Sequence, residues 1–425
     1  MQLKPIRKTL TLATCSLLTA TSQGVKAVET AEPWQVDSAV LYYSEADRVS
    51  LVEPVVNARK EISDDEFLEV RVVADTLTGA SANGAIPTSS PQTFTSPSGR
   101  KSYTIDANET PLDPTFEDLR AAINLAWDKP ITDDSRRILS AYTSLEMDYR
   151  SFGFGNTYTR DFNQRLTTLT YGFGMNLDQV IASGSTPVGL APVSTTPVVF
   201  FGDEDEGDGD FEIKFVTDFI VGLTRVINRH TLTQLNYTLG IDNGYLTDPY
   251  KVISVVDATT GILASSPYRY EKRPDSRIRN ALFWQTKHQF TDDVISVAYR
   301  YFWDDWGITS HTLDLNYRFE MNKNHFLRPH IRYYRQSSAD FYYTFLTDNQ
   351  NVSHASADYR LGDLTTKTVG IEYGLGLGEG QNLSLKLESM NQSGHPSDVI
   401  GVQQSQDLFP DVESIILQLN YFLYY

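Results

Sequence analysis

The chain of 425 residues has one cysteine, no apolar run approaching 20 residues and few basic residues. Cys15 lies near the N-terminus, so the rest of the chain has no thiol for a disulfide, a catalytic nucleophile or a thiolate metal site. The lack of a long apolar run, with a mean hydropathy of −0.32, excludes a protein that crosses a membrane with helices. A membrane barrel is not excluded, because only every second residue of its strands faces lipid.

Basic residues are scarce: 36 Lys and Arg stand against 54 Asp and Glu, a net charge of −18. Residues 1–27 hold four of the bases and no acid, which leaves −22 for the remainder. This balance argues against a nucleic-acid partner, which requires clustered positive charge. An acid excess commonly serves solubility and loop solvation. A narrower interpretation is that acidic loops share the divalent cations that bridge anionic outer-leaflet lipids.

Residues 1–27 have the three parts of a secretory signal peptide. Lys4, Arg7 and Lys8 form the basic start, residues 10–20 are apolar, and residues 25–27 read VKA, a small-x-small cleavage site. The sequence therefore predicts export through the inner membrane and removal of this segment.

The strongest pattern is alternation with a period of two, in segments of about ten to fourteen residues. From His311 to Met321 the odd positions are mostly apolar or aromatic, whereas the even positions are Thr, Asp, Asn, Arg and Glu. Residues 167–177, 231–241 and 295–303 alternate in the same way. Each segment is expected to be a strand with one apolar face and one face of polar, charged or glycine residues.

Connections of two lengths alternate along the chain. Short polar turns follow a large apolar residue, as at 162–165, 227–230 and 321–324. Long polar stretches lie near 76–114, 178–210, 243–276, 339–356 and 392–411. Tight periplasmic turns and long extracellular loops produce this alternation in a membrane barrel. We therefore predict an all-β protein, a transmembrane antiparallel up-and-down β-barrel of about 16 strands (14 is the nearest rival), as one domain over residues 28–425.

The chain ends in VESIILQLNYFLYY, with an apolar or aromatic residue at every second position back from Tyr425. A barrel must pair its last strand with its first, because an open edge in hydrocarbon leaves costly unpaired backbone groups. This ending resembles the terminal signal that outer-membrane assembly machinery reads in bacterial barrel proteins. The resemblance implies a bacterial outer-membrane location, with membrane lipids and the barrel-assembly machinery as partners.

A narrower resemblance covers most of the chain after residue 27. Residues 74–85 read ADTLTGASANGA, residues 91–99 read PQTFTSPSG and residues 160–165 read RDFNQR. These stretches resemble DUF3570, a family of bacterial proteins thought to be outer-membrane barrels, with no agreed activity. The family signature corresponds to Asp75, Gly79, Asn83 and Gly84.

The polar face of the predicted strands supplies candidate lumen residues. They share the parity opposite to the apolar face and are charged: Arg300, Asp314, Arg318, Glu320, Arg332, Glu372, Lys386 and Glu388. Rings of charge set selectivity in channels, but oppositely charged neighbours can also pair and fill the space. Both interpretations stay open here. Aromatic residues at strand ends (Trp284, Trp303, Trp306 and Tyr373) are expected to form interface girdles.

Residues 202–210 read GDEDEGDGD and form the sharpest run of acidic charge. Hard oxygens at alternate positions suit Ca²⁺, so a weak metal site is predicted from Asp203, Asp205, Asp208 and Asp210. The alternative is a solvated loop without an ion. No other cofactor is expected.

Enzyme motifs are weak. Ser310 and His311 are adjacent and therefore point to opposite faces of a strand, so they cannot form a dyad. The leading hypothesis is a porin-like conduit for small solutes, and the protein is not expected to be an enzyme. The alternatives are a non-conducting barrel scaffold whose outer loops bind a partner or a cation and, less favoured, an outer-membrane hydrolase. The oligomeric state is left open.

Overall fold

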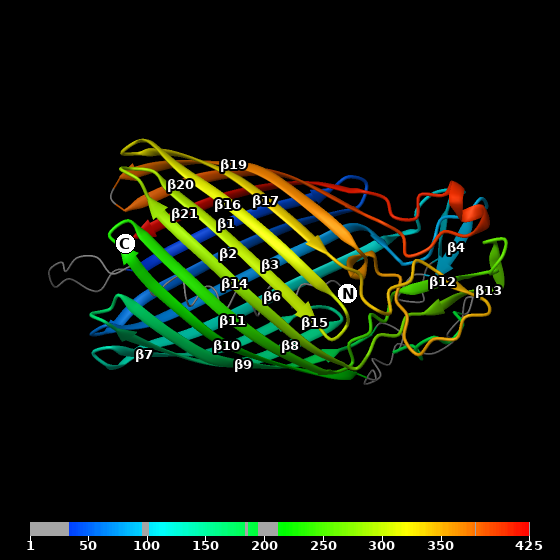
Figure 1. Ribbon diagram of the computed structural model, residues 1–425, viewed down its shortest axis with the longest axis horizontal. Helices are drawn as coiled ribbons and strands as arrows, with labels where there is room; N and C mark the ends of the chain where they lie inside the picture. Colours follow the sequence, from blue (N-terminus) through cyan, green and yellow to red (C-terminus); the bar gives the residue numbers. More distant parts are fainter. Residues whose placement is uncertain (1–33, 96–101, 183–185, 194–210, 379, 425) are drawn as a thin grey trace, which may run out of the picture.

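Sixteen strands form a closed barrel in the computed structural model, which describes residues 34–95, 102–182, 186–193, 211–378 and 380–424 (Figure 1). All neighbouring strands are antiparallel and follow one another along the chain, so the predicted architecture and strand count are confirmed. The barrel strands are β1 (Trp34–Glu45), β2 (Val49–Ser63), β3 (Glu66–Ala82), β6 (Leu112–Thr132), β7 (Ser135–Leu145), β8 (Tyr149–Phe162), β9 (Thr167–Val180), β10 (Glu212–Asn228), β11 (Thr231–Gly244), β14 (Ser276–Gln289), β15 (Val294–Asp304), β16 (Thr309–Asn322), β17 (His325–Gln336), β19 (Leu364–Gly378), β20 (Gln381–Gly394) and β21 (Val412–Tyr424).

The other elements are short and lie in the long connections. They are β4 (Gln92–Thr95), β5 (Ser102–Ile105), β12 (Val252–Val256), β13 (Leu263–Tyr270), β18 (Leu346–Thr347) and the 3-10 helices η1 (Tyr359–Leu361) and η2 (Gly401–Ser405). Within the described residues, no helix has the length and apolar character needed to cross a membrane.

The barrel closes where the last strand meets the first. β1 and β21 pair antiparallel from Gln35↔Tyr424 to Glu45↔Ser414, without a register shift. The alternation at the C-terminus is therefore that of a closing strand, whose backbone groups bond to β20 on one side and β1 on the other. Tyr425 itself, like residues 1–33 with the predicted signal peptide, lies outside the described residues.

The outer face of the barrel is apolar along most of its length. On β21, Ile415 and Leu419 are 56% and 46% exposed, whereas Ser414, on the other face, is 3% exposed. Leu119, Val221 and Val369 repeat this pattern on other strands, each more than half exposed. A closed barrel with an apolar exterior and a polar interior has the structure that spans a membrane, because hydrocarbon covers the outside and all ladder bonds are internal.

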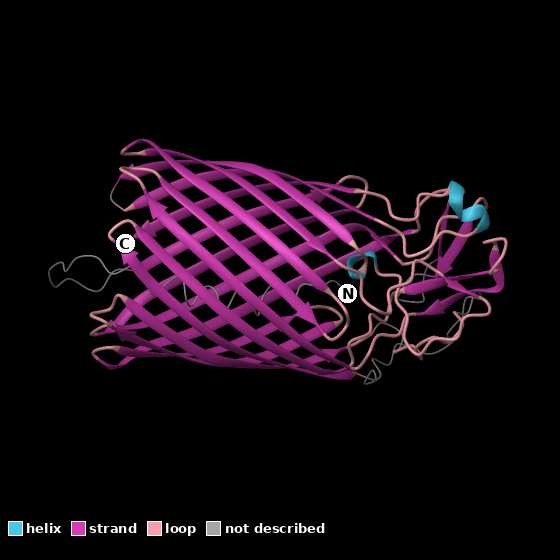
Figure 2. Cartoon of the chain, viewed as in Figure 1, coloured by secondary structure: helices cyan, strands magenta, loops and turns pink. Residues whose placement is uncertain are grey.

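The two ends of the barrel differ. Tight turns join the strands at one end, where Asn163, Gln164 and Arg165 all have positive φ in the connection between β8 and β9. The long connections gather at the other end and extend beyond the barrel (Figure 2). The start of β1 pairs with the last residues of β2, next to the tight turn that follows β2, and β21 ends at the same level. Both ends of the barrel-forming chain therefore lie at the end with the tight turns. We call the two ends of the barrel the turn end and the loop end.

At the loop end the strands are longer than the sequence indicates. The predicted loop 76–114 is shortened on both sides, because β3 continues to Ala82 and β6 begins at Leu112. The pair has one register shift, between Gly79 and Ser81. These strands therefore carry their connection, residues 83–111, above the neighbouring turns.

Candidate functional site: the lumen and its cap

The predicted lumen residues lie on the inner face, and the structure joins most of them in ion pairs. Lys386 lies 2.8 Å from Glu388 on β20, Arg318 contacts Glu320 on β16, and Glu372 of β19 receives Arg328 of β17. Asp314 and Arg332 face each other across β16 and β17 in the strand register. A paired, charged wall is therefore present along β16 to β20.

His330 lies at the centre of this wall and was not singled out from the sequence. Its two ring nitrogens lie 3.0 Å from a carboxylate oxygen of Asp314 and 2.5 Å from one of Glu388. The imidazole thus links three strands, β16, β17 and β20. The sequence does indicate its position: His330 is separated by two residues from both Arg328 and Arg332, so it lies on the same face of β17 as they do.

Arg300 differs from Arg318 and Lys386, each of which pairs with a glutamate, because no described carboxylate lies within 4.0 Å of its guanidinium. Its Nε is buried, and among the described atoms it has no hydrogen-bond acceptor. The guanidinium lies 5.3 Å from the centre of the Phe302 ring on the same strand.

The signature residue Asp75 is a structural group of the inner wall on β3. Its side chain is fully buried and accepts from Arg120 Nε at 2.5 Å, and Arg120 also contacts Glu53 of β2 at 3.1 Å. Arg120 is itself 1% exposed. The pair connects β2, β3 and β6 just below the loop end.

Two of the other signature residues, Asn83 and Gly84, tie the β3–β6 connection to the β11–β14 connection. Asn83 accepts from the N–H of Ala85, donates to the Tyr103 hydroxyl, and its carbonyl accepts from the N–H of Val252 at 2.9 Å. Gly84 has a φ of 97°, and a Cβ there would lie 2.2 Å from the Val252 carbonyl oxygen. Gly79 is equally constrained, with a φ of 126°. The motif is thus an anchor for a folded loop.

Replacing Gly84 by alanine is expected to loosen this anchor. A left-handed conformation costs a non-glycine residue about 1–2 kcal/mol, and the contact with the Val252 carbonyl adds to it. Gly378 is the matched control, because its φ is 89° but a Cβ there would meet nothing within 4 Å. Hydrogen exchange at the Val252 amide should accelerate in Gly84→Ala and not in Gly378→Ala. Equal protection in the two variants would contradict the anchoring role.

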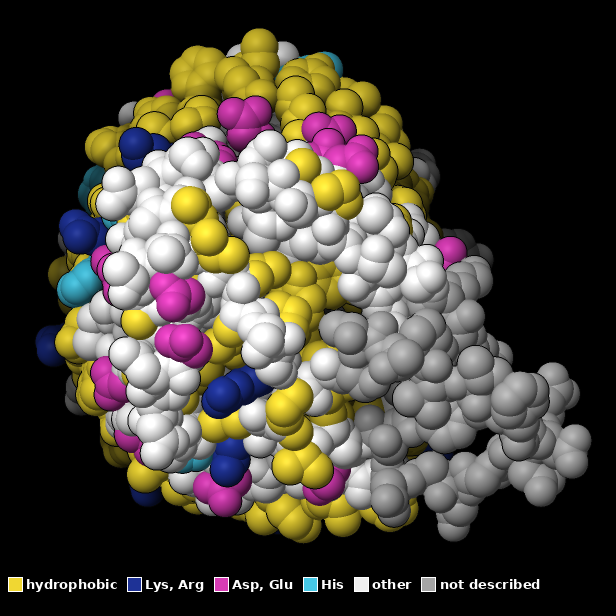
Figure 3. Space-filling view, turned by 90° about the vertical axis from the view of Figure 1, so that its right-hand side faces the viewer, with side chains coloured by type: hydrophobic (Ala, Val, Ile, Leu, Met, Phe, Trp, Pro, Cys, Tyr) yellow, Lys and Arg dark blue, Asp and Glu magenta, His cyan; other side chains and the backbone are white. Residues whose placement is uncertain are grey.

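The long connections pack together into one folded cap (Figures 1 and 2). β12 is fully buried and pairs antiparallel with β13 and parallel with β18. Phe94 of the β4–β5 hairpin contacts Tyr268 of β13, with ring centres 5.0 Å apart. Ile86, Val256 and Phe345 form a second cluster that Ile400 and Leu408 join. The cap therefore takes side chains from connections between residues 83 and 411. Where Figure 3 shows described residues of its outer surface, they are mostly uncharged.

The cap core continues into the mouth of the barrel. A cluster of buried residues joins cap residues with inward residues of β14 and β15: Ala281, Phe302, Trp306, Ile308, Ala339, Phe341, Tyr342, Leu361, Leu364 and Phe409. The prediction that Trp306 belongs to an interface girdle is wrong, because its ring is 5% exposed and packs edge-on against Phe341. Trp284 and Tyr373 do lie exposed on the outer face.

A buried network of charges joins the β11–β14 and β17–β19 connections. Arg273 contacts Glu271 at 2.7 Å and Asp358 at 3.0 Å, and Arg360 contacts Asp358 at 2.6 Å. Ser356 donates to Glu271 at 2.5 Å, and the N–H of Asp248 donates to it at 2.7 Å. The side chains of Glu271 and Asp358 are completely buried. We call these residues, with Lys251, the cap charge network.

The network shifts the protonation of its acids in opposite directions. Burial alone would raise the pKa of Asp358, but attraction by Arg360 and Arg273 outweighs burial and holds it well below its ordinary value. Burial raises the pKa of Glu271. Because the pKa of Asp358 is lower in the folded state, the stability it supplies is present above about pH 4 and is lost as the pH falls further.

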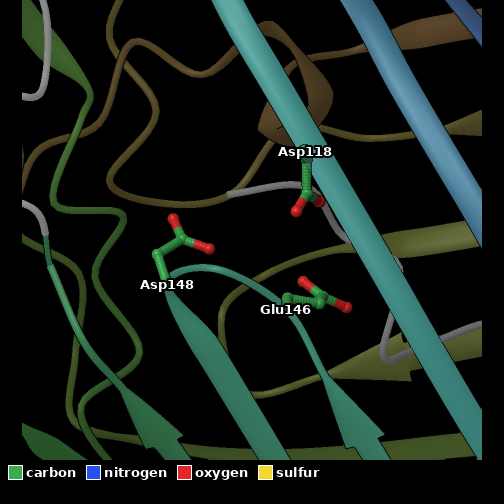
Figure 4. Close-up of side chains that lie close together, drawn as sticks. All are labelled: Asp118, Glu146 and Asp148. Carbon is green, nitrogen blue, oxygen red and sulfur yellow. The ribbon is translucent and has the colours of Figure 1, made fainter.

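Three acidic side chains meet at the loop end of β6 and β7. Asp118 lies on β6, and Glu146 and Asp148 lie in the β7–β8 connection (Figure 4). One carboxylate oxygen from each lies within 4.8 Å of the others. Carboxylate oxygens are ligands that Ca²⁺ accepts, yet such acidic groups also occur without an ion. The predicted candidates Asp203, Asp205, Asp208 and Asp210 lie outside the described residues.

Ser310 and His311 point to opposite faces, as expected for neighbours on a strand. Ser310 is buried on the inner face, whereas His311 is exposed and its Nδ1 lies 2.7 Å from the Tyr299 hydroxyl.

Comparison with known proteins places the chain in a family. The family described as "Protein of unknown function (DUF3570)" matches residues 7–423, nearly the whole chain. The chain belongs to the DUF3570 family. The resemblance carried by the glycine-asparagine-glycine signature is thereby confirmed. No curated protein matches this DUF3570 protein in sequence.

Solved structures that match this DUF3570 protein are membrane barrels. The siderophore receptor PirA from Pseudomonas aeruginosa matches with a TM-score of 0.41 and 8% identity, over 93% of this chain and 64% of the receptor. OccK5 (OpdH) of Pseudomonas aeruginosa matches with a TM-score of 0.41 and 8% identity, over 93% and 98% of the two chains. The CymD monoaromatic hydrocarbon channel gives 0.39 and 9%, over 93% and 89%. The chain spans about three fifths of the length of the siderophore receptors that it matches. All three TM-scores are below 0.5, so the porin-like architecture rests on the strand order of this chain.

Proposed function

We propose that this DUF3570 protein is an outer-membrane conduit through which small solutes pass, with the cap limiting entry at the loop end. One observation carries the proposal: the inner wall of a closed sixteen-strand barrel is lined with charged side chains that keep partial exposure, such as Arg300, Arg318 and Asp314. Barrels of this size leave an aqueous lumen unless they are filled, and charged side chains keep that exposure only where water reaches them.

The proposed orientation and route of assembly follow from the same features. The loop end faces the cell exterior and the turn end the periplasm, as in other membrane barrels. We further propose that residues 1–27 direct export and that the assembly machinery recognises β21 and closes it on β1. No catalytic activity is part of the proposal.

Planar-bilayer recording of the purified protein tests the conduit. We expect discrete current steps in KCl, with larger or more frequent openings when the cap charge network is broken by Asp358→Asn. A protein-free detergent sample is the control. A silent bilayer for both proteins at high density would refute the conduit.

A non-conducting scaffold is the second candidate, and one observation favours it. The buried cluster that includes Phe302 and Trp306 extends from the cap into the mouth and fills part of it. If the scaffold is correct, neither the native protein nor Asp358→Asn conducts. Both should still be folded barrels, which unheated samples show by a shift in mobility on a denaturing gel relative to heated samples. The two candidates thus differ in the current of the loosened variant.

A further inference from the structure

Positive charge is concentrated on one part of the inner wall. On β14 to β17 the inward basic residues outnumber the inward acids Asp304, Asp314 and Glu320; they are Arg277, Arg279, Lys287, Arg300, Arg318, Arg328 and Arg332. This contrasts with the whole chain, in which acids outnumber bases. A local excess of one sign inside a barrel raises the concentration of the opposite ion there.

Four of these bases, Arg277, Arg279, Arg318 and Arg328, form ion pairs with a carboxylate. Arg277 pairs with Asp304, and Arg279 lies 2.7 Å from Asp242. Neither Arg300 nor Lys287 has a described carboxylate within 4.0 Å. An unpaired cation that is partly withdrawn from water is unfavourable, so an anion that neutralises it gains binding energy. On this wall, binding of a mobile anion is therefore expected to be most favourable at Arg300 and Lys287.

Arg300 has the better geometry of the two. Its guanidinium packs beside Phe302, which fixes it on the wall below the cap core, and its Nε has no acceptor among the described atoms. Arg279 and Arg332 lie near enough to act on its charge, as does the Tyr334 side chain. A planar guanidinium donates two parallel hydrogen bonds to a carboxylate or a phosphate. Several arginines around one such group form an anion site.

Lys287 lies further toward the turn end. It is opposite Ser296 in the β14–β15 register, four residues along β15 from Arg300, or about 13 Å along the strand. Arg328 is the charged neighbour that acts on it. An anion that leaves Arg300 toward the turn end therefore meets a second basic position.

We propose that Arg300, with Arg279 and Arg332 beside it, is a binding site for small anions that carry a carboxylate or phosphate group, and that Lys287 continues their path through the barrel. The role of these residues in transport rests on the proposed conduit, whereas anion binding at Arg300 does not depend on it. The site below the cap admits the anion, and the absence of a permanent carboxylate partner lets it leave again, because conduction requires binding that is weak enough to release.

Two measurements test the site. Reversal potentials across a KCl gradient should show anion preference for the native protein and a shift toward zero for Arg300→Gln. Calorimetric titration in detergent with succinate, and separately with inorganic phosphate, should give affinities that fall by roughly tenfold or more in the same variant, as expected for loss of one charge-assisted group. Arg300→Lys keeps the charge and should retain selectivity while binding the probe more weakly. The stronger of the two probes identifies the anion class.

Arg335→Gln is the matched control, because Arg335 is exposed on the outer face of β17 and should change neither measurement. Native binding of both probes by Arg300→Gln would overturn the proposal, as would a native protein that binds neither probe or that prefers cations. A silent bilayer with probe binding that still depends on Arg300 would refute the conduit and leave the anion site standing.

Discussion

Asp358→Asn is expected to unfold the cap while the barrel stays intact. The carboxylate is completely buried and contacts both Arg273 and Arg360, so the substitution leaves two buried guanidinium groups with one acid fewer. Removing one partner of a buried ion pair costs about 3–5 kcal/mol. The cap should open, and protease added to intact cells should cut at the buried strand β12 (Val252–Val256), which we expect the folded cap to shield.

Asp398→Asn is the matched control in the same cap. Its carboxylate is exposed and accepts a hydrogen bond from the N–H of Val399, so protection should be unchanged. Native protection in Asp358→Asn would mean that the cap charge network does not hold the cap together. Lowering the pH below about 4 should weaken the cap of the native protein progressively, because Asp358 takes up a proton more readily in the unfolded cap than in the folded cap, where its pKa is depressed.

Leu419→Arg is expected to prevent stable insertion of the barrel. Leu419 lies near the middle of β21, and its side chain is on the outer face, 46% exposed to what is lipid in the membrane. An arginine at the bilayer midplane of a barrel costs about 2–4 kcal/mol. The penalty falls on the strand that closes the barrel against β1. Urea unfolding in lipid vesicles should show the loss.

Gln418→Arg adds the same charge one residue away, on the inner face, and controls for the change in sequence. It should insert with nearly native stability, because the lumen accepts charge. Equal losses in both variants would show that β21 tolerates no arginine on either face, and the assignment of lipid to the outside would lose its support.

The alternation of apolar and polar residues predicts the barrel, because one face of a membrane strand contacts lipid and the other face contacts water. The predicted count of about 16 strands is confirmed, and one of the strands, β2, contains Pro54, which lies opposite Val40 in the ladder. The strand ends were less accurate. Beyond the bilayer the constraint on the outer face is lost, so β3 could not be followed past Asp75 by its pattern.

The cap could not be predicted, because its contacts join residues far apart in the chain. Position at a strand end predicts a girdle residue at Trp306, yet β15 ends at Asp304 and the Trp306 indole packs in the buried cluster of the cap. His330 was missed because only acids, lysines and arginines were considered for the lumen. In contrast, the inward placement of Asp314, Arg318 and Glu388 follows from parity alone.

The long-range contacts of the cap determine the stage of folding at which the cap can form. The N–H of Val252 donates to the carbonyl of Asn83, and Val256 packs with Phe345 and Ile400. The cap therefore forms only when segments from both halves of the chain are in place. Contacts of such long sequence separation form late, because the intervening chain must be ordered beforehand. The pairs between β1 and β21 join residues even further apart, so closure of the barrel and completion of the cap both belong to the last stage of folding.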